Sequence, residues 1–232
     1  MRKMQQLLGA ASLIIASQLT QADAIGLYAG AGVWQAEADN KADIAALSVN
    51  DIDLGDDSSN FAYIALEHPI PLIPNIRLQQ VDLDLSSNGA TSIDLDITHQ
   101  DAILYYEILD NWVNLDLGLS ARRYDGTAYV SNGAGRVKLN VDDVLPMIYA
   151  KAQFDLPFSG LSIAADLNAT DYSGDEITDA SIKLAYESDL IPLLGLGAEI
   201  GYRYMSMELD DLRYLDKELT VDGPYAAITL HF

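Results

Sequence analysis

The sequence predicts an all-β chain that folds as an up-and-down antiparallel β-barrel of about ten strands. Three observations lead to this prediction: apolar and polar residues alternate with a period of two, the alternating runs are even in number, and short connections alternate with mostly longer ones. A period of two indicates strands with one buried face. Alternating connection lengths are typical of a meander whose tight turns all lie at one end.

The alternation is clearest in the second half of the chain. In the run at residues 112–124 the apolar set is Val113, Leu115, Leu117, Leu119 and Ala121, and the intervening set is Asn114, Asp116, Gly118, Ser120 and Arg122. Successive side chains of a strand point to opposite faces of the sheet. Each such run therefore predicts a strand with one apolar face and one polar face.

Ten runs of this kind are expected to form strands, at residues 25–36, 59–67, 76–86, 92–108, 112–124, 144–155, 161–172, 177–187, 196–206 and 224–232. The short connections between them are 68–75, 109–111, 156–160 and 188–195, and the others are 37–58, 87–91, 125–143, 173–176 and 207–223. The run at 92–108 has no clear parity around His99, which is compatible with a bulge there. Eight or twelve strands also fit, because boundaries read from sequence carry errors of several residues.

The first 24 residues have the pattern of a secretory signal peptide. Arg2 and Lys3 precede an apolar stretch at residues 7–19, and the small residues around Ala24 provide a cleavage site. A membrane anchor needs about 20 apolar residues, and this stretch is shorter. We therefore expect cleavage after Ala24, which leaves residues 25–232 as a single folded domain.

The composition argues against several classes of protein. Asp and Glu number 35 against 13 Lys and Arg, so the formal net charge is -22 and nucleic-acid binding is not expected. Half of the residues are hydrophobic, which is incompatible with an acidic disordered chain. The chain has no cysteine, so disulfides, thiolate metal sites and cysteine nucleophiles are all excluded.

Two architectures fit the alternating strands: a soluble β-sandwich with its apolar faces in the core, and a membrane barrel with its apolar faces on lipid. In a narrow barrel the polar side chains must pair with one another inside. The expected luminal ion network consists of Arg122, Lys151, Lys183, Arg203, Asp116, Asp166, Glu187 and Glu199. Aromatic residues near the run ends predict girdles at two membrane interfaces; they are Tyr28, Trp34, Tyr105, Trp112, Tyr124, Phe154, Tyr172, Tyr186, Tyr202 and Tyr204.

The ends of the expected domain carry its most specific features. Residues 27–34 form an opening run rich in Tyr and Gly, and the chain ends on a strand that places Ile228, Leu230 and Phe232 on one face. With the signal segment and the alternating strands, these features resemble the small outer-membrane β-barrel proteins of Gram-negative bacteria. The resemblance implies a transmembrane barrel in the cell outer membrane, in contact with membrane lipid and lipopolysaccharide. It also implies that the barrel assembly machinery reads the terminal strand through Ile228, Leu230 and Phe232.

Acidic residues gather in the longer connections, which are all expected at the external end of the barrel. The first connection offers oxygen ligands for weakly bound Ca²⁺ or Mg²⁺ through Asp51, Asp53, Asp56 and Asp57. The match to a calcium loop is poor, because Gly55 falls where a ligand is expected. A solvated acidic loop is the alternative reading. No tightly bound cofactor is expected.

A second acidic set is expected on one hairpin, whose polar face carries Asp82, Asp84, Asp94 and Asp96. Like charges that face each other across strands are destabilising unless water, cations or basic residues intervene. This hairpin is therefore expected to stand in solvent above the membrane or, alternatively, to line a mouth that attracts cations.

The sequence does not favour an enzyme. His68 and His231 are expected at the periplasmic end, which leaves His99 as the one plausible base, and its chain neighbours point to the opposite face of the strand. A ten-stranded interior is also too narrow for a wide aqueous pore. We therefore expect a structural or surface-interaction role with a largely filled lumen. A narrow cation-preferring or small-solute channel and an outer-membrane hydrolase remain alternatives.

Overall fold

The computed structural model describes residues 25–38, 41–44, 49–53, 57–87, 91–132, 135–191, 194–208 and 219–232. The expected signal segment at residues 1–24 therefore lies outside the described residues. The described strands are β1 (Gly26–Ala38), β2 (Lys41–Ile44), β3 (Val49–Asp53), β4 (Asp57–Glu67), β5 (Asn75–Asp82), β6 (Asp84–Ser87), β7 (Thr91–Asp96), β8 (His99–Leu109), β9 (Val113–Asn132), β10 (Gly135–Leu156), β11 (Leu161–Tyr172), β12 (Asp175–Ile191), β13 (Leu194–Glu208) and β14 (Leu219–His231).

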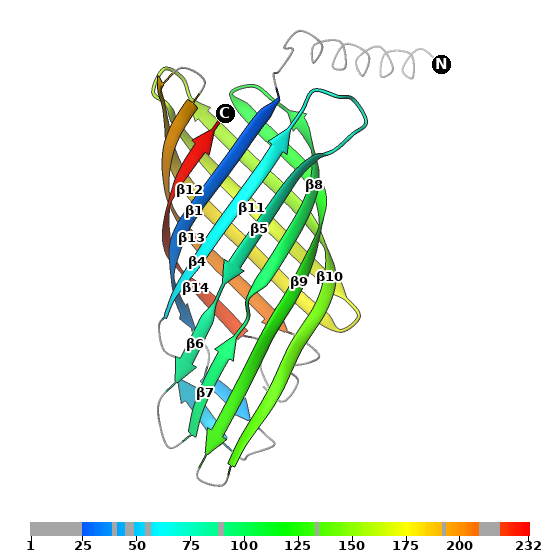
Figure 1. Cartoon of the computed structure of the whole chain (residues 1–232), viewed down its shortest axis with the longest axis vertical. Coiled ribbons are helices and arrows are strands. Elements are labelled where there is room, and N and C mark those ends of the chain that lie inside the picture. The colour runs from blue at the N-terminus through cyan, green and yellow to red at the C-terminus, as the bar shows by residue number, and fades with distance from the viewer. Residues whose placement is uncertain are drawn as a thin grey trace, which may run out of the picture.

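The chain forms a closed antiparallel barrel of ten strands, with β6 and β7 as extensions beyond it (Figure 1). Around the barrel the order is β1, β4, β5, β8, β9, β10, β11, β12, β13 and β14. The barrel closes where β1 pairs with β14, and the backbones of Leu27 and Phe232 exchange two hydrogen bonds at the end of this seam. Closure leaves the barrel wall without an unpaired edge.

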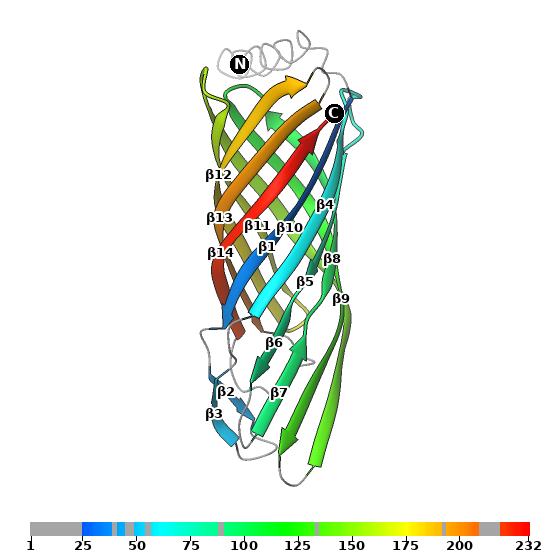
Figure 2. The ribbon, with the colours of Figure 1, turned by 60° about the vertical axis from the view of Figure 1, so that its left-hand side comes forward.

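The two ends of the barrel differ. Both ends of the described chain and the connections at residues 68–74, 110–112 and 157–160 lie at one end, which we name the turn end. At the opposite end, named the loop end, the β6–β7 hairpin and the tips of β9 and β10 extend past the barrel (Figure 2). The β2–β3 hairpin lies at the loop end as well.

Apolar side chains face outward around the middle of the barrel. Leu119, Ile228 and Ile200 are 67%, 65% and 61% exposed, whereas Arg122 on the inner face of β9 is completely buried. This arrangement is the reverse of that in a soluble domain, and it is what a wall against hydrocarbon requires. We name these outward residues the apolar belt, which includes Ile64, Leu78, Leu104, Leu117, Leu119, Ile148, Ile182, Ile200 and Ile228. Within the described chain, no helix has the length and hydrophobicity of a membrane span.

Toward the loop end the apolar residues lie on the inner face of the strands and the polar residues on the outer face. Leu78 on β5 is exposed, but Leu83 and Leu85 further along the chain are buried, and the side chain of Asp84 between them is exposed. The buried side chains at this end form one cluster, which we name the apolar cap: Trp34, Ala36, Ala38, Leu83, Leu85, Leu95, Ile97, Tyr124, Ala128, Leu145, Met147, Ile177, Met205, Met207, Leu219, Val221 and Tyr225. The loop end is therefore packed like a soluble protein, with an apolar core inside and acids outside.

Each predicted run corresponds to a barrel strand, and the run at residues 161–172 coincides with β11. The run at 92–108 is divided at residues 97–98, between β7 and β8, but the inward parity continues from Leu95 through His99 to Ile103. The predicted bulge near His99 is wrong in position, because the register shift of β8 against β9 lies between Glu107 and Leu109. The predicted connection at residues 125–143 is wrong. β9 continues to Asn132 and β10 begins at Gly135, and the two strands pair along this whole stretch. Polar residues there, among them Asp125, Lys138 and Asp142, belong to the outer face of an extended hairpin.

The predicted aromatic girdles are wrong for part of their set. The side chains of Trp112, Phe154, Tyr186, Tyr202 and Tyr204 are exposed on the outside, as a girdle requires. Tyr172 is also exposed, but it is the last residue of β11 and pairs with the buried Asp175, so it has the inward parity of its strand. Trp34, Tyr105 and Tyr124 are instead buried inside, and Tyr28 lines a cavity at the turn end. Rings at these inward positions fill a lumen that is narrow enough to be packed by side chains.

Candidate functional site

Charged side chains cross the lumen directly beneath the apolar cap. Nε and Nη2 of Arg122 donate to the two carboxylate oxygens of Asp101 at 2.7 and 2.8 Å, and Nη2 also donates to Oδ2 of Asp179 at 2.6 Å. Arg203 holds the same aspartate through Nε and Nη2, at 2.8 and 2.6 Å. We name these four residues the luminal bridge. Their charges balance, which is what buried ionic groups require.

The positions of these residues follow from strand parity and from the order of strands around the barrel. Asp101 on β8 and Arg122 on β9 are paired neighbours, whereas Asp179 on β12 and Arg203 on β13 lie on the other side of the ring. The bridge therefore spans the lumen. It also contacts the apolar cap, because the guanidinium of Arg203 lies 4.9 Å from the ring centroid of Trp34.

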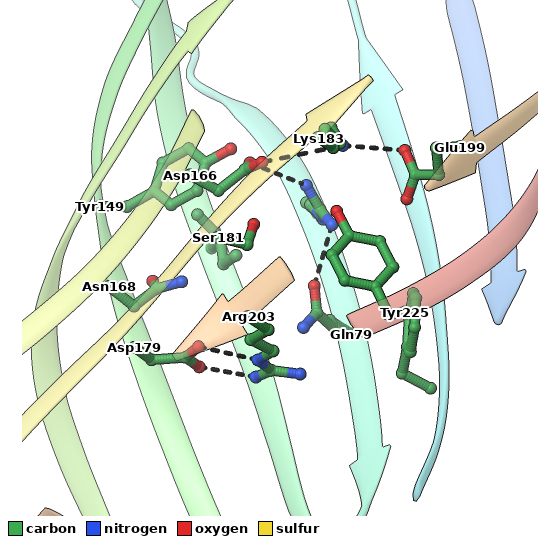
Figure 3. Close-up of a pocket in the computed structure, with 13 residues that line it drawn as sticks. Gln79, Tyr149, Asp166, Asn168, Asp179, Ser181, Lys183, Glu199, Arg203 and Tyr225 are labelled. Atoms are coloured by element: carbon green, nitrogen blue, oxygen red, sulfur yellow. Dashed lines mark hydrogen bonds and ion pairs between the residues drawn. The ribbon is translucent and has the colours of Figure 1, made fainter. Parts of the chain in front are cut away.

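A second charged layer lies nearer to the turn end, because Lys183 follows Asp179 along β12 in that direction. Figure 3 shows Lys183, Asp166 and Glu199 apart from Asp179 and Arg203. Nζ of Lys183 lies 3.0 Å from Oε2 of Glu199 and 3.7 Å from Oδ2 of Asp166. Arg77 approaches the other oxygen of Asp166 at 3.7 Å and stacks over the ring of Tyr63. In the same layer Nζ of Lys151 lies 3.4 Å from Oδ2 of Asp116.

The space between the two layers is small. The cavity there has a volume of about 50 Å³ and is lined by both layers, including Arg77, Asp166, Asp179 and Arg203 (Figure 3). One water occupies roughly 10–15 Å³ on this measure, so the cavity holds a few waters at most. The side chains themselves therefore fill the centre of the barrel.

At the turn end the lumen widens into an acidic cavity of about 210 Å³. The hydroxyl of Tyr105 donates to Glu67 at 2.7 Å, and the amide of Asn75 donates to Glu107 at 3.2 Å. Nδ1 of His231 lies 3.2 Å from Oε1 of Glu187 at the rim of this cavity. Carboxylates predominate here, so the cavity favours small cations over anions.

The predicted luminal residues occupy both layers, and one of them lies apart. Arg122 and Arg203 belong to the bridge, and Lys151, Lys183, Asp116, Asp166 and Glu199 form the second layer. Glu187 is placed elsewhere, because its carboxylate pairs with His231 at the turn-end rim.

Three charged residues of the bridge and the second layer are absent from the predicted network: Arg77, Asp101 and Asp179. The parity of each run carries a signal for them. Asp179 shares its face of β12 with Lys183, and Asp101 shares its face of β8 with His99. An inward parity at these positions indicates the lumen, but it does not indicate which residue meets which across it.

His99 lies among the buried groups of the loop end and does not form a catalytic pair with Asp101. Its Nδ1 lies 3.2 Å from the carbonyl oxygen of Ile97, and its ring packs against Tyr124. Both carboxylate oxygens of Asp101 are occupied by Arg122. Among the residues that the structure describes, Nε2 of His99 has no hydrogen-bond partner.

No group of three metal-ligating side chains is present among the described residues. The predicted weak ligands Asp51, Asp53, Asp56 and Asp57 have side chains that lie outside the described residues. The terminal-strand residues Ile228 and Phe232 are exposed on the outer wall, at 65% and 53%. Leu230 is partly exposed on the same strand face.

Neither the protein-family models nor the curated proteins give a match to this chain. Among solved structures, the translocator domain of the autotransporter NalP from Neisseria meningitidis is similar with a TM-score of 0.49 and 11% identity, over 99% of this chain and 95% of that one. The Escherichia coli outer membrane protease OmpT gives 0.42 and 11%, over 91% and 97%. Neisserial surface protein A gives 0.33 and 14%, over 89% and 95%. These outer-membrane barrels differ in their roles, and similarity at this level indicates no particular role for this chain.

Proposed function

We propose that this protein is an integral outer-membrane β-barrel with a largely filled lumen and a structural or surface-interaction role. The observation that carries the proposal is the luminal bridge, in which Arg122, Asp101, Asp179 and Arg203 are linked across the barrel beneath the apolar cap. Ionic groups held at 2.6–2.8 Å and covered by packed apolar side chains leave little space for a permeating solute.

The orientation of the proposed barrel follows from its ends. The turn end, with its short connections and both ends of the barrel chain, faces the periplasm, and the loop end with its acidic hairpin faces the outside. In this proposal residues 1–24 are a signal peptide removed after Ala24. The barrel assembly machinery then reads the terminal strand through Ile228, Leu230 and Phe232. Membrane lipid and lipopolysaccharide surround the apolar belt.

Two measurements on the detergent-purified mature protein test this function. The folded barrel is expected to migrate differently on gels before and after heating, and a single position in both samples would reject a closed barrel. In planar bilayers the protein is expected to give no conductance steps. Regular steps from pure protein would reject the filled lumen while leaving the barrel intact.

A narrow cation-preferring channel is the second candidate, and one observation favours it. The turn-end cavity is acidic and reaches as far as Lys183 and Glu199 in the second charged layer. Cation-selective steps in the same recordings would support this candidate. Because the luminal bridge lies beyond that layer, any such steps should increase in the Arg203→Ala variant.

A further inference from the structure

A groove lies on the outside of the barrel, where the apolar belt ends toward the loop end. Its volume is about 650 Å³, within the range of about 300–1,000 Å³ that is typical of small-ligand sites. Five neighbouring strands, β4, β5, β8, β9 and β10, contribute to it. Its lining includes Leu78, Ala102, Ala121 and Val144 and the polar residues Gln80, Gln100 and Arg123.

Strand register explains why the wall is hollowed here. Leu78 pairs with Ala102, and Ala102 pairs with Ala121, so two small side chains follow a large one along the same row. Leu78 is 48% exposed at one side of the two alanines, whereas Val144 on β10, which is 57% exposed, lies in the next row toward the loop end, where it pairs with Arg123. The two alanines form a low floor beside Leu78.

The adjacent row toward the loop end is polar. Gln80 pairs with Gln100, and Gln100 pairs with Arg123, so two amides and a guanidinium follow one another across the strands. The amide of Gln100 lies 3.4 Å from that of Gln80. The groove thus has an apolar floor and, at its loop end, a polar margin with one positive charge.

The charge of Arg123 contrasts with its surroundings. The outer face of the loop end carries many acids, including Asp84, Asp94, Asp125 and Asp142. Among the described residues, outward-facing cations occur on β9 and β10, at Arg123, Arg136 and Lys138. Arg136 and Lys138 lie over the ring of Tyr129, and Arg136 also pairs with Asp94. Arg123 has no ion-pair partner in the described part of the chain.

We propose that this groove binds lipid A, the phosphorylated glycolipid of the outer leaflet, with one acyl chain on the alanine floor and a phosphate beside Arg123. The inference rests on the proposed membrane-spanning function, which places the loop-end edge of the apolar belt at the outer leaflet. Apolar area accommodates the chain, and the guanidinium provides donors and charge for the phosphate. On an otherwise acidic surface, Arg123 is positioned where an anionic headgroup meets the belt.

The test measures binding of lipid A to the detergent-purified full-length mature protein by native mass spectrometry. Bis-phosphorylated lipid A is compared with its dephosphorylated form. Arg123→Gln removes the charge, and Ala102→Leu fills the floor. The matched controls are Arg136→Gln, an outward cation away from the groove, and Ala198→Leu, an outward alanine on β13. All four positions face outward, so the folded barrel is retained, and heat-dependent gel mobility verifies it.

The wild type is expected to prefer the phosphorylated form. Arg123→Gln should weaken binding of that form about fivefold and reduce the preference, because one basic side chain near a membrane surface contributes about 1 kcal/mol. Ala102→Leu should weaken both forms, and the two controls should bind like the wild type. If the wild type shows heat-dependent gel mobility but binds both forms of lipid A equally, the proposed site is wrong and the barrel is not affected. The same conclusion follows if the control variants lose as much binding as the test variants. If the wild type shows no heat-dependent change in gel mobility, the result contradicts the proposed membrane barrel itself.

Discussion

Nη2 of Arg122 lies 2.6 Å from Oδ2 of Asp179, although the two residues belong to β9 and β12, which do not pair with each other. Two further strands, β10 and β11, separate them along the wall. The contact therefore connects parts of the barrel that backbone hydrogen bonds do not join directly. Because Arg203 holds the same carboxylate, loss of Asp179 leaves two buried guanidinium groups with fewer partners.

Asp179→Ala is expected to destabilise the barrel by about 3–5 kcal/mol, because removing one partner of a buried ion pair leaves uncompensated charge. Urea unfolding of the protein in lipid vesicles, followed by tryptophan fluorescence, measures this change. Asp94→Ala is the matched control. Its pair with Arg136 is more than half exposed, so the change there should be within about 1 kcal/mol. Equal losses of unfolding free energy in the two variants would show that the luminal bridge does not stabilise the barrel.

The apolar cap predicts a contrast between adjacent residues of β6. Leu85 is 1% exposed, and Leu85→Ala should lower the free energy of unfolding by about 2–5 kcal/mol through lost burial and a new cavity. Ser86 points to the outside, and Ser86→Ala should change it by no more than about 0.5 kcal/mol. The same unfolding experiment compares both. A tolerated Leu85→Ala would show that the loop end has no packed core.

The third prediction concerns the loss of stability when a side chain is added at Gly118 on β9. It pairs with Tyr105 on one side and Tyr149 on the other, and a Cβ atom there would collide with the backbone of Leu104 and Tyr105. Gly118→Ala should therefore cost about 1–3 kcal/mol through overpacking. Gly135→Ala is the control, because a Cβ at that position meets nothing within 4 Å. Thermal unfolding in detergent that gives the two variants the same midpoint would contradict the close approach at Gly118.

Much of the barrel could be predicted from sequence because a period of two reports directly on a two-faced strand. The run at 161–172 has clear alternation and turn residues at both ends, and its bounds agree with β11. The stretch at 125–143 is different. Gly126 and the small residues near 132–135 resemble a loop, and what makes this stretch part of two strands is pairing between β9 and β10 beyond the apolar belt. That pairing is a tertiary interaction.

The exchange of faces at the loop end could not be predicted either. Alternation shows that Leu83 and Asp84 point to opposite sides, but the inward side depends on whether the outside is lipid or water at that height. The same limit applies to Asp101 and Asp179. The sequence indicates that both aspartates point inward. Their ion pairs with Arg122 depend on the tilt and stagger of the strands around the closed barrel.

The central claim is that the outward apolar belt contacts hydrocarbon while the polar faces are enclosed, and spin labels on single cysteines test it most directly. The chain contains no cysteine, so each label reports on one position. In lipid vesicles, labels at Leu117→Cys and Leu119→Cys should be relaxed by oxygen dissolved in the bilayer, and a label at Asp84→Cys by a water-soluble nickel chelate. Labels at residues 117 and 119 that are reached only by the chelate, or by neither agent, would contradict the claim.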